Sequence, residues 1–577
     1  MLIRLLRSYL RPYRRPLTFV IVLQLVQTLA TLYLPTLNAD IIDNGVITGN
    51  THYILHTGGV MLAVALVQIT CATGAVFFGA RTAMALGRDI RQGVFNRVMD
   101  FSAREVGRFG TPSLITRTTN DVQQVQMLAL MTFTLMVSAP IMCVGGILLA
   151  LNQNVTLSSL LLVAVPLLAV IVSLIIWRMR QLFRSMQERI DQINSVLREQ
   201  ITGVRVVRAF VRDRHERDRF AGASEQLFDV SRGAGRLMAL MFPSVMLVLN
   251  FSSVAVLWFG GHLVDSGAMQ IGSLTAFLTY LLQILMAVMM ATFMFIMVPR
   301  AEVCAERIVE VLDTDPDIVQ PESGISETAV HGYLELRDAE FRFPGAEQPV
   351  LHGISLTARP GEVTAIIGGT GSGKTTLVHL IPRLLDVTSG SLLVGGVDVR
   401  ELDPAQLSAA VGIVPQKPYL FSGTVATNLR YGNQQATDED LWRALEIAQA
   451  RDFVERMPEG LDSPIAQGGT NVSGGQRQRL AIARALVHKP QIYLFDDSFS
   501  ALDYATDARL RSALATQVTG ATMIIVAQRV ATIRHADQIL VLDAGRIAAR
   551  GTHAELMESS ETYREIVLSQ LTEQEAA

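Results

Sequence analysis

Six long apolar stretches occupy the first half of the chain. They cover residues 17–37, 59–79, 133–151, 157–177, 241–263 and 274–298. Each is close to the ~20 residues that a helix needs to cross the hydrocarbon core of a bilayer. The pattern therefore predicts six membrane-spanning helices.

Arginine is distributed unevenly among the segments that connect these stretches. Residues 38–58, 152–156 and 264–273 contain no lysine or arginine, whereas the N-terminus and the connections 81–131 and 178–240 are rich in arginine. Because cytoplasmic loops of membrane proteins carry an excess of these residues, we expect both termini and both long connections in the cytoplasm. The chain has lysine only at positions 374, 417 and 489, and arginine supplies nearly all other positive charge. This usage is typical of a GC-rich bacterial genome, so the expected location is a bacterial cytoplasmic (inner) membrane.

The two long connections have a helical composition with few prolines. We therefore expect each of them to extend the flanking spans as helices into the cytoplasm. Gly107, Gly110 and Pro112 interrupt the helical pattern of the first connection and predict the place where the chain turns back.

Polar side chains are sparse within the six stretches, and no charged residue lies near the middle of one. Such polar groups usually face the interior of a helix bundle, where they either line a substrate path or bond one helix to another. They are Gln24, Gln27, Thr28, Gln68, Thr70, Asn250, Ser252, Thr279, Tyr280 and Gln283. The lack of buried charge disfavours an ion-coupled carrier.

The last apolar stretch is rich in methionine and phenylalanine. These deformable side chains suit a surface that contacts varied apolar ligands, although lipid contact or core packing is the more common role of any one of them. They are Met286, Met289, Met290, Phe293, Met294, Phe295 and Met297.

The pattern changes in the second half of the chain. Prolines, glycines and acidic residues mark a linker, and from Leu334 onward β-type runs alternate with helical ones, as in an α/β domain with a largely parallel sheet. We expect an all-α six-helix transmembrane domain at 1–305, a linker at 306–332, the α/β domain at 333–566 and a tail at 567–577. A mean hydropathy of +0.34 is unusual for a wholly soluble protein, which the six predicted spans exclude, and a net charge of −3 gives no indication of nucleic-acid binding.

A glycine-rich segment in the α/β half fits the phosphate-binding loop pattern G-x-x-x-x-G-K-[ST]. It lies between an apolar strand pattern and a helical one, where backbone N–H groups and the helix N-terminus bind phosphate oxygens. It comprises Gly368, Gly369, Thr370, Gly371, Ser372, Gly373, Lys374, Thr375 and Thr376. Lys374 is expected to reach the β- and γ-phosphates of a nucleotide, and the Thr375 hydroxyl to ligate Mg²⁺.

Two further segments downstream carry related chemistry. The apolar run 492–496 ends in Asp496, a carboxylate that can hold Mg²⁺ directly or through water. Residues 473–476, of sequence Ser-Gly-Gly-Gln, precede a strong helical pattern at 477–487 and form a second glycine-rich helix start that can bind phosphate.

With these motifs at these intervals, the chain resembles the ATP-binding cassette (ABC) transporters, specifically exporter-type half-transporters. Ser473, Gly474, Gly475 and Gln476 match the family's signature motif, and Ser500–Asp503 matches its D-loop, with Asp503 in the nucleotide site. Gln416 matches the glutamine that senses Mg²⁺ and the attacking water. Phe343 takes the place of the aromatic residue that stacks on adenine. Residues 116–122 and 203–210 resemble the family's two cytoplasmic-loop motifs.

The resemblance implies ATP and Mg²⁺ as cofactors, with two nucleotides sandwiched head to tail between two cassettes. Three residues depart from the family pattern. Asp497 stands where the family has the glutamate that polarises water, Gln528 replaces the switch histidine, and Gln467 replaces a glutamate that contacts the cytoplasmic loops. A carboxylate misplaced by about 1 Å lowers a rate roughly a hundredfold, and glutamine cannot become cationic.

We therefore predict a heterodimer with a second half-transporter, in which this chain holds ATP at a slowly hydrolysing site. Its intact signature would complete the partner's competent site. A homodimer, in which the two substitutions are drift without functional loss, is the alternative. The expected cargo is amphiphilic, lipid-like or drug-like and moves outward. Alternative functions are a siderophore-type or lipid importer of the same fold, and an ATP-gated channel or regulatory membrane subunit.

Overall fold

The computed structural model describes residues 1–321 and 323–570, with the side chains of 293–296 excluded. The expectation for Phe293, Met294 and Phe295 therefore lies outside the described side chains. The chain forms two compact units, one made of Met1–Asp100 and Phe109–Asp315, the other of Phe101–Arg108 and the residues from Pro316 onward.

Six helical segments of the first unit are long and apolar enough to cross a membrane, as the sequence predicts. They are Leu2–Val46, Thr51–Met99, Thr111–Gln153, Val155–Thr202, Asp213–Asp265 and Ile271–Asp313. The helices of residues 1–315, which include α4 and α10 between these segments, are α1 (Leu2–Leu10), α2 (Arg14–Ile41), α3 (Thr51–Met99), α4 (Ala103–Phe109), α5 (Thr111–Thr116), α6 (Val122–Met131), α7 (Ser138–Gln153), α8 (Val155–Ser158), α9 (Leu161–Thr202), α10 (Val204–Ala209), α11 (Asp213–Asp265) and α12 (Ile271–Asp313). The all-α membrane half of the predicted fold class is confirmed.

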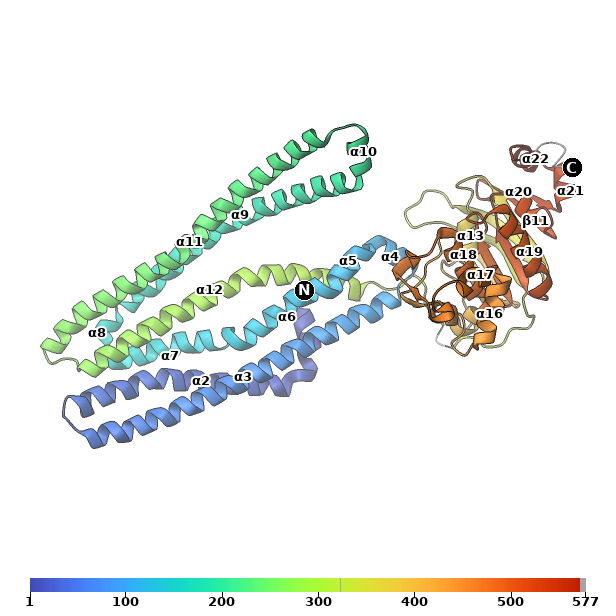
Figure 1. Cartoon of the computed structure of the whole chain (residues 1–577). Helices are drawn as coiled ribbons and strands as arrows, with labels where there is room; N and C mark the ends of the chain where they lie inside the picture. The colour runs from blue at the N-terminus through green and yellow to red at the C-terminus, as the bar shows by residue number, and fades with distance from the viewer. Residues whose placement is uncertain (322, 571–577) are drawn as a thin grey trace. The chain divides into compact units, whose positions relative to one another are not determined.

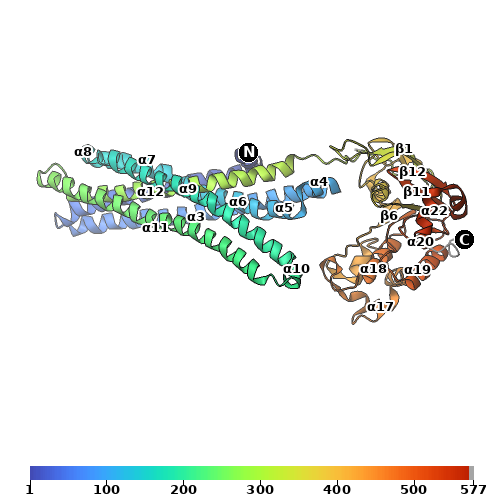
Figure 2. The same cartoon turned by 90° about the horizontal axis from the view of Figure 1, so that it is seen from above.

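The long connections are helical extensions of the spans, as expected. The helix α3 continues to Met99 and α9 to Thr202, far beyond the apolar stretches that they contain. The first connection turns at Gly110, whose φ of +75° lies in the left-handed region between α4 and α5. Helices α9 and α11 pack along each other, and α10 joins their tips; Figures 1 and 2 show this pair diverging from the other helices of the unit towards α10.

Three wide turns with the π-helical hydrogen-bond pattern interrupt these segments, at Ile42–Val46, Arg117–Asp121 and Thr132–Met136. A π-helical turn accommodates an extra residue and disturbs the regular ladder of backbone hydrogen bonds. Gln24, buried on α2, donates its side-chain amide to the Phe133 and Thr134 carbonyl oxygens of the third turn, at 3.4 and 3.2 Å. This polar residue of a span therefore bonds one helix to another.

Tyr280 is the second buried polar side chain that links two spans. Its hydroxyl lies 2.6 Å from the Thr36 hydroxyl and donates to the Leu32 carbonyl oxygen at 3.1 Å, so α12 is bonded to α2. By contrast Asn250 and Thr70 are exposed in the single chain. Of the two roles open to the polar span residues, Gln24 and Tyr280 take the helix-to-helix one.

A network of charged residues, in which Arg117 and Asp121 are buried, joins the π-helical turn Arg117–Asp121 to the C-terminal part of α12. The Arg117 guanidinium donates to the Arg307 carbonyl oxygen and to the Glu310 carboxylate, both at 2.7 Å. The Arg307 side chain pairs with Asp121 at 3.4 Å. Because a buried charge is costly unless it is paired, these contacts fix the turn against α12.

The second unit is an α/β domain with a largely parallel central sheet, which confirms the other half of the fold class. Its six-stranded sheet has the order β12-β11-β3-β10-β9-β6, in which only β12 is antiparallel to its neighbour. A four-stranded antiparallel sheet has the order β2-β1-β4-β5, and β7 pairs with β8. The strands are β1 (Leu334–Phe341), β2 (Leu351–Ala358), β3 (Val363–Gly368), β4 (Ser389–Val394), β5 (Val397–Asp398), β6 (Val411–Val414), β7 (Gly423–Thr424), β8 (Pro464–Ile465), β9 (Ile492–Asp496), β10 (Thr522–Val526), β11 (Gln538–Asp543) and β12 (Arg546–Gly551).

The helices of this unit are α13 (Lys374–Leu380), α14 (Pro404–Ala410), α15 (Val425–Arg430), α16 (Asp438–Ile447), α17 (Arg451–Glu455), α18 (Gly474–His488), α19 (Tyr504–Gln517), α20 (Val530–Ile533), α21 (His553–Ser559) and α22 (Glu561–Leu568). Helices α13, α14 and α18 contact strands of the central sheet, and α15 and α16 pack on α18. The expected domain limit at 305 falls inside α12, and the limit at 566 falls inside α22. The four domain limits stay predictions.

Candidate nucleotide site

The phosphate-loop segment lies at the end of β3, in the middle of the buried parallel sheet. Gly371 and Gly373 have φ values of +83° and +97°, which side chains other than glycine rarely adopt. A Cβ atom at Gly368 would lie 2.1 Å from the Leu542 carbonyl oxygen of the neighbouring strand. These three positions therefore require glycine, and the tight turn between strand and helix depends on them.

Lys374 begins α13 and folds its side chain back over this loop. Its ammonium donates to the carbonyl oxygens of Gly368 at 2.8 Å and Gly369 at 2.7 Å, and lies 3.4 Å from the Ser372 hydroxyl. Burial lowers the pKa of the Lys374 ammonium, and the charges of Asp497 and Asp496 oppose that shift. The arrangement places a partly desolvated positive charge against the carbonyl oxygens at the start of the loop.

Asp496 and Thr375 supply neighbouring oxygen atoms. The Thr375 hydroxyl donates to the Asp496 carboxylate at 3.3 Å, and Asp496 is buried at the end of β9. Burial raises the pKa of the Asp496 carboxyl. A hydroxyl and a carboxylate beside phosphate-binding backbone groups are the ligands that Mg²⁺ prefers when it is bound together with a nucleotide, so these residues fit the expected ion.

The three predicted catalytic residues, Asp497, Gln416 and Gln528, form one cluster around the Asp497 carboxylate. One oxygen of its carboxylate accepts hydrogen bonds from the side-chain amides of Gln416 at 3.3 Å and Gln528 at 3.1 Å. Its backbone has a φ of +47°, in the left-handed region that aspartate and asparagine tolerate better than other side chains. Burial raises the pKa of the Asp497 carboxyl, and the Gln416 amide opposes that shift.

A cavity of about 610 Å³ lies over the loop. Most of the predicted loop residues line it together with Gln416 and Gln528, and this volume is in the range of small-molecule sites. The predicted residues that line it are Gly368, Gly369, Thr370, Gly371, Gly373, Lys374, Thr375, Thr376, Gln416 and Gln528. The structure therefore places the phosphate loop and two of the predicted catalytic side chains around one cavity.

The other predicted site residues are outside the described lining of this cavity. Phe343, expected to stack on adenine, packs edge-on against Phe341 with ring centroids 4.8 Å apart and is 43% exposed. Ser473 and Gln476 form a reciprocal capping box at the start of α18, which includes Gly474 and Gly475. Asp503 caps α19 by accepting the Thr506 N–H at 2.9 Å. In one chain these polar residues stabilise helix starts.

Five lining residues were missed by the sequence analysis: Val350 precedes β2, Ile367 lies on β3, and three lie near the C-terminal end. Ile566, Ser569 and Gln570, at the end of α22 and just after it, form part of the cavity wall. They belong to no motif, and the expected cassette limit left Ser569 and Gln570 in the tail. The chain's amphipathic C-terminal helix was the one available signal that this segment packs on the domain.

Two family models match the chain. The ABC transporter transmembrane region matches residues 17–288, and the ABC transporter cassette matches residues 351–500. An uncharacterized ABC transporter ATP-binding protein of Mycobacterium tuberculosis is 54% identical over 99% of this chain and 98% of its own length. The chain belongs to the ABC transporters.

More distant relatives of this ABC transporter include proteins whose names carry an activity. An ATP-dependent lipid A-core flippase of Syntrophus aciditrophicus is 32% identical over 81% of this chain and 78% of its own length. A multidrug efflux ATP-binding/permease protein of Mycobacterium tuberculosis is 31% identical over 97% of this chain, which spans 47% of that protein. A solved bacterial Atm1-family ABC exporter with ATP bound has a TM-score of 0.81 at 24% identity, covering 97% of this chain and 100% of the other, and thus shares its fold.

These comparisons give the coarse function. The transporter is a multi-pass membrane protein with the fold of an exporter-type half-transporter, its cassette belongs to a family that binds and hydrolyses ATP, and exporters of this type function as dimers.

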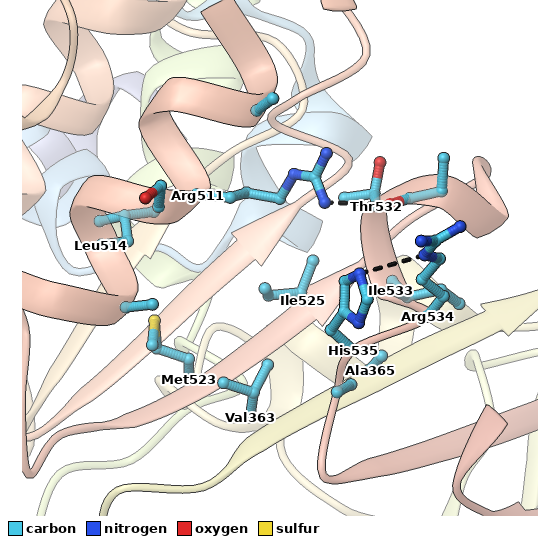
Figure 3. Close-up of a pocket in the computed structure, with 15 residues that line it drawn as sticks. Val363, Ala365, Arg511, Leu514, Met523, Ile525, Thr532, Ile533, Arg534 and His535 are labelled. Atoms are coloured by element: carbon cyan, nitrogen blue, oxygen red, sulfur yellow. Dashed lines mark hydrogen bonds between the residues drawn. The ribbon is translucent and has the colours of Figure 1, made fainter. Parts of the chain in front are cut away.

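A second cavity of the cassette, of about 500 Å³, is lined by α19, α20 and the strands β3 and β10 (Figure 3). Val363, Met523 and Ile525 form an apolar floor on the strands. Above them Arg511 of α19 donates to the Ala531 carbonyl oxygen of α20 at 2.9 Å, and its charge is paired with Asp507. These contacts hold the short helix α20, which follows Gln528, against α19.

Proposed function

We propose that this ABC transporter is one subunit of an ATP-driven exporter and that its own phosphate loop retains ATP with slow hydrolysis. In this proposal Lys374 contacts the β- and γ-phosphates, and Thr375, Asp496 and Gln416 hold Mg²⁺. The ion would neutralise phosphate charge, while the protein supplies orientation and exclusion of water.

The observation that carries the proposal is the Asp497 cluster. The residue placed to activate water is one methylene shorter than glutamate, and one of its carboxylate oxygens accepts two amide hydrogen bonds, from Gln416 and Gln528. Gln528 offers an amide where a titratable imidazole would be needed to take part in proton transfer. Both features favour binding of a nucleotide over its hydrolysis at this loop.

The partner in this proposal is a second, different half-transporter. Ser473, Gly474, Gly475 and Gln476 retain the signature motif, and in the family's head-to-tail arrangement this segment of one chain faces the phosphate loop of the other. This chain would then complete a competent site on its partner while Phe343 and Asp503 complete its own. Two identical chains would instead combine two impaired sites, which makes the heterodimer the functional form.

The proposed cargo is amphiphilic and leaves the cytoplasm or the inner leaflet of a bacterial cytoplasmic membrane. The spans carry polar groups that are used for helix-to-helix bonds, and the described part of α12 adds the soft side chains Met286, Met289 and Met290. The names of two relatives, a lipid A-core flippase and a multidrug efflux protein, support the same chemical class for this transporter.

The test compares the purified chain in lipid nanodiscs with the same chain co-purified with a second half-transporter encoded beside it. We expect MgATP to bind in both preparations, with brisk phosphate release and lipid or dye movement only in the pair. Brisk hydrolysis by the chain alone would refute the impaired site and the heterodimer together. Passive flux without ATP dependence would refute the exporter.

A further inference from the structure

The C-terminal end of the described chain forms a direct contact with the loop that carries Gln528. The side chain of Gln570 donates from Nε2 to the Gln528 carbonyl oxygen at 2.7 Å and accepts the Val530 N–H at Oε1, at 2.9 Å. One amide group thus bonds both sides of Arg529. This is the pattern by which a neighbouring strand would pair with an extended segment.

The contact fulfils a need of the short helix α20. The first N–H groups of a helix lack partners within the helix, and Arg529, in the N-cap position, provides no side-chain hydrogen bond. Val530 is fully buried, so its N–H has no route to water. Gln570 supplies the missing acceptor from a segment 40 residues further along the chain.

The position of Gln570 is itself fixed by the packing of α22. Tyr563 and Val567 are fully buried in the main core of the cassette, and the Tyr563 hydroxyl is hydrogen-bonded to Nδ1 of His553 at 2.8 Å. Ser560 caps the start of the helix by accepting the Tyr563 N–H. The end of α22 is therefore held in place, and Gln570 reaches the Gln528 loop without a flexible linker.

Gln570 holds the backbone of Gln528, while the side-chain amide of Gln528 donates to the Asp497 carboxylate. Across the loop, Arg529 lies over the Tyr504 ring at 5.0 Å, and Arg511 bonds the Ala531 carbonyl oxygen of α20 (Figure 3). Gln570 is the contact that bonds the backbone of Gln528 itself, and it also lines the cavity over the phosphate loop.

We propose that Gln570 is a positioning residue: it holds the Gln528 backbone so that the Gln528 amide, which donates to Asp497 and lines the cavity over the phosphate loop, lies within reach of the γ-phosphate of bound ATP. This inference rests on the proposed nucleotide site. Its consequence is selective, because ADP has no γ-phosphate. Loss of the Gln570 contact should weaken ATP binding and leave ADP binding unchanged.

The experiment measures dissociation constants of fluorescent N-methylanthraniloyl ATP and ADP, with Mg²⁺, for the full chain in nanodiscs. Gln570→Ala is expected to weaken ATP binding roughly fivefold, the size of one net hydrogen bond, without changing ADP binding. Gln570→Glu should behave in the same way, because it keeps an acceptor for Val530 but places an oxygen against the Gln528 carbonyl. Ser559→Ala is the matched control, since Ser559 is not part of the cavity lining and its hydroxyl bonds the Glu555 carbonyl oxygen of the preceding turn.

A double-mutant cycle with Gln528→Ala separates the possible results. In the Gln528→Ala background, Gln570→Ala should have no further effect on the ratio of ATP to ADP affinity. Suppose that Gln528→Ala lowers the ratio of ATP to ADP affinity as expected. If Gln570→Ala then weakens the binding of ATP and ADP equally, or changes neither, the positioning role of Gln570 alone is refuted. If Gln528→Ala leaves the ratio of ATP to ADP affinity unchanged, the contact of Gln528 with the γ-phosphate is refuted, and with it the role of Gln570. Failure of every variant and of the unmodified chain to bind ATP would instead refute the proposed nucleotide site.

Discussion

Replacing Asp497 by glutamate tests the impaired site most directly. The substitution lengthens the side chain by one methylene, about 1.5 Å of reach along a C–C bond. Asp497→Asn is the matched control, because asparagine keeps the length and the acceptor oxygen for the Gln416 and Gln528 amides but cannot accept a proton from water. Asparagine also tolerates the left-handed backbone at this position, where φ is +47°.

The expected size of the gain follows from the geometry. If a displacement of about 1 Å costs roughly a hundredfold, a restored reach should raise kcat by about 10- to 100-fold, equivalent to ~1.4–2.7 kcal/mol of activation barrier. Glutamate in a left-handed conformation costs on the order of 1 kcal/mol more than aspartate, so the variant should unfold at a slightly lower temperature. Asp497→Asn should leave the residual rate unchanged, because the carboxylate contributes little as a base.

Phosphate release at saturating MgATP, measured for the chain in nanodiscs with and without its partner, gives kcat. Nucleotide affinity is measured in parallel, so that a change in binding is not mistaken for a change in chemistry. The reasoning would be wrong if the unmodified chain hydrolyses ATP briskly and Asp497→Asn abolishes that rate. Aspartate would then be the working base, and the substitution would be drift.

Three further outcomes follow from contacts described above. Tyr563→Ala should lower the free energy of unfolding of the cassette by about 3–5 kcal/mol by removing a buried ring, whereas Tyr563→Phe, which loses only the hydrogen bond to His553, should cost about 1 kcal/mol; thermal denaturation separates the two. Gln24→Leu should cost about 1–3 kcal/mol in a detergent unfolding assay, because it leaves two carbonyl oxygens of the turn Thr132–Met136 without their donor, and a stability equal to that of the unmodified chain would contradict this. Burial raises the pKa of Asp496, so the folded chain binds this proton more tightly than the unfolded chain: stability without nucleotide should fall as the pH rises from the ordinary aspartate range through the raised pKa. MgATP binding, which needs the ionised carboxylate, should weaken as the pH falls through that same raised pKa; a dissociation constant that stays flat from neutral pH down to the ordinary aspartate range would contradict it.

Much of the fold could be predicted because its signals are local. A run such as 157–177 is apolar enough to identify a span by itself, and the glycines at 371 and 373 are required by backbone angles that follow from a tight strand-to-helix turn. Asp496 could be placed at the end of a buried strand from the run that precedes it. In each case the residues that carry the signal are neighbours in sequence.

The remaining features depend on contacts between residues far apart in the chain. Gln570 meets Gln528, and Arg117 meets Glu310, through side-chain hydrogen bonds that leave no periodic pattern in either segment. Phe343 is a related case. Its position in the motif predicts stacking on adenine, but the arrangement of the loops around the cavity determines what its ring contacts. Such contacts depend on the three-dimensional fold and cannot be predicted from the local sequence.

The three π-helical turns of the membrane unit have a mechanical consequence. Each is a site where a helix already holds one residue more than its regular pitch allows, so releasing or passing on that residue shifts the following segment by a fraction of a turn while the helix stays continuous. Two of the turns, Arg117–Asp121 and Thr132–Met136, flank α6. The helix α6 therefore lies between two irregular turns, one bonded to α12 through Arg117 and the other bonded to α2 through Gln24, and these contacts set its angle about its own axis.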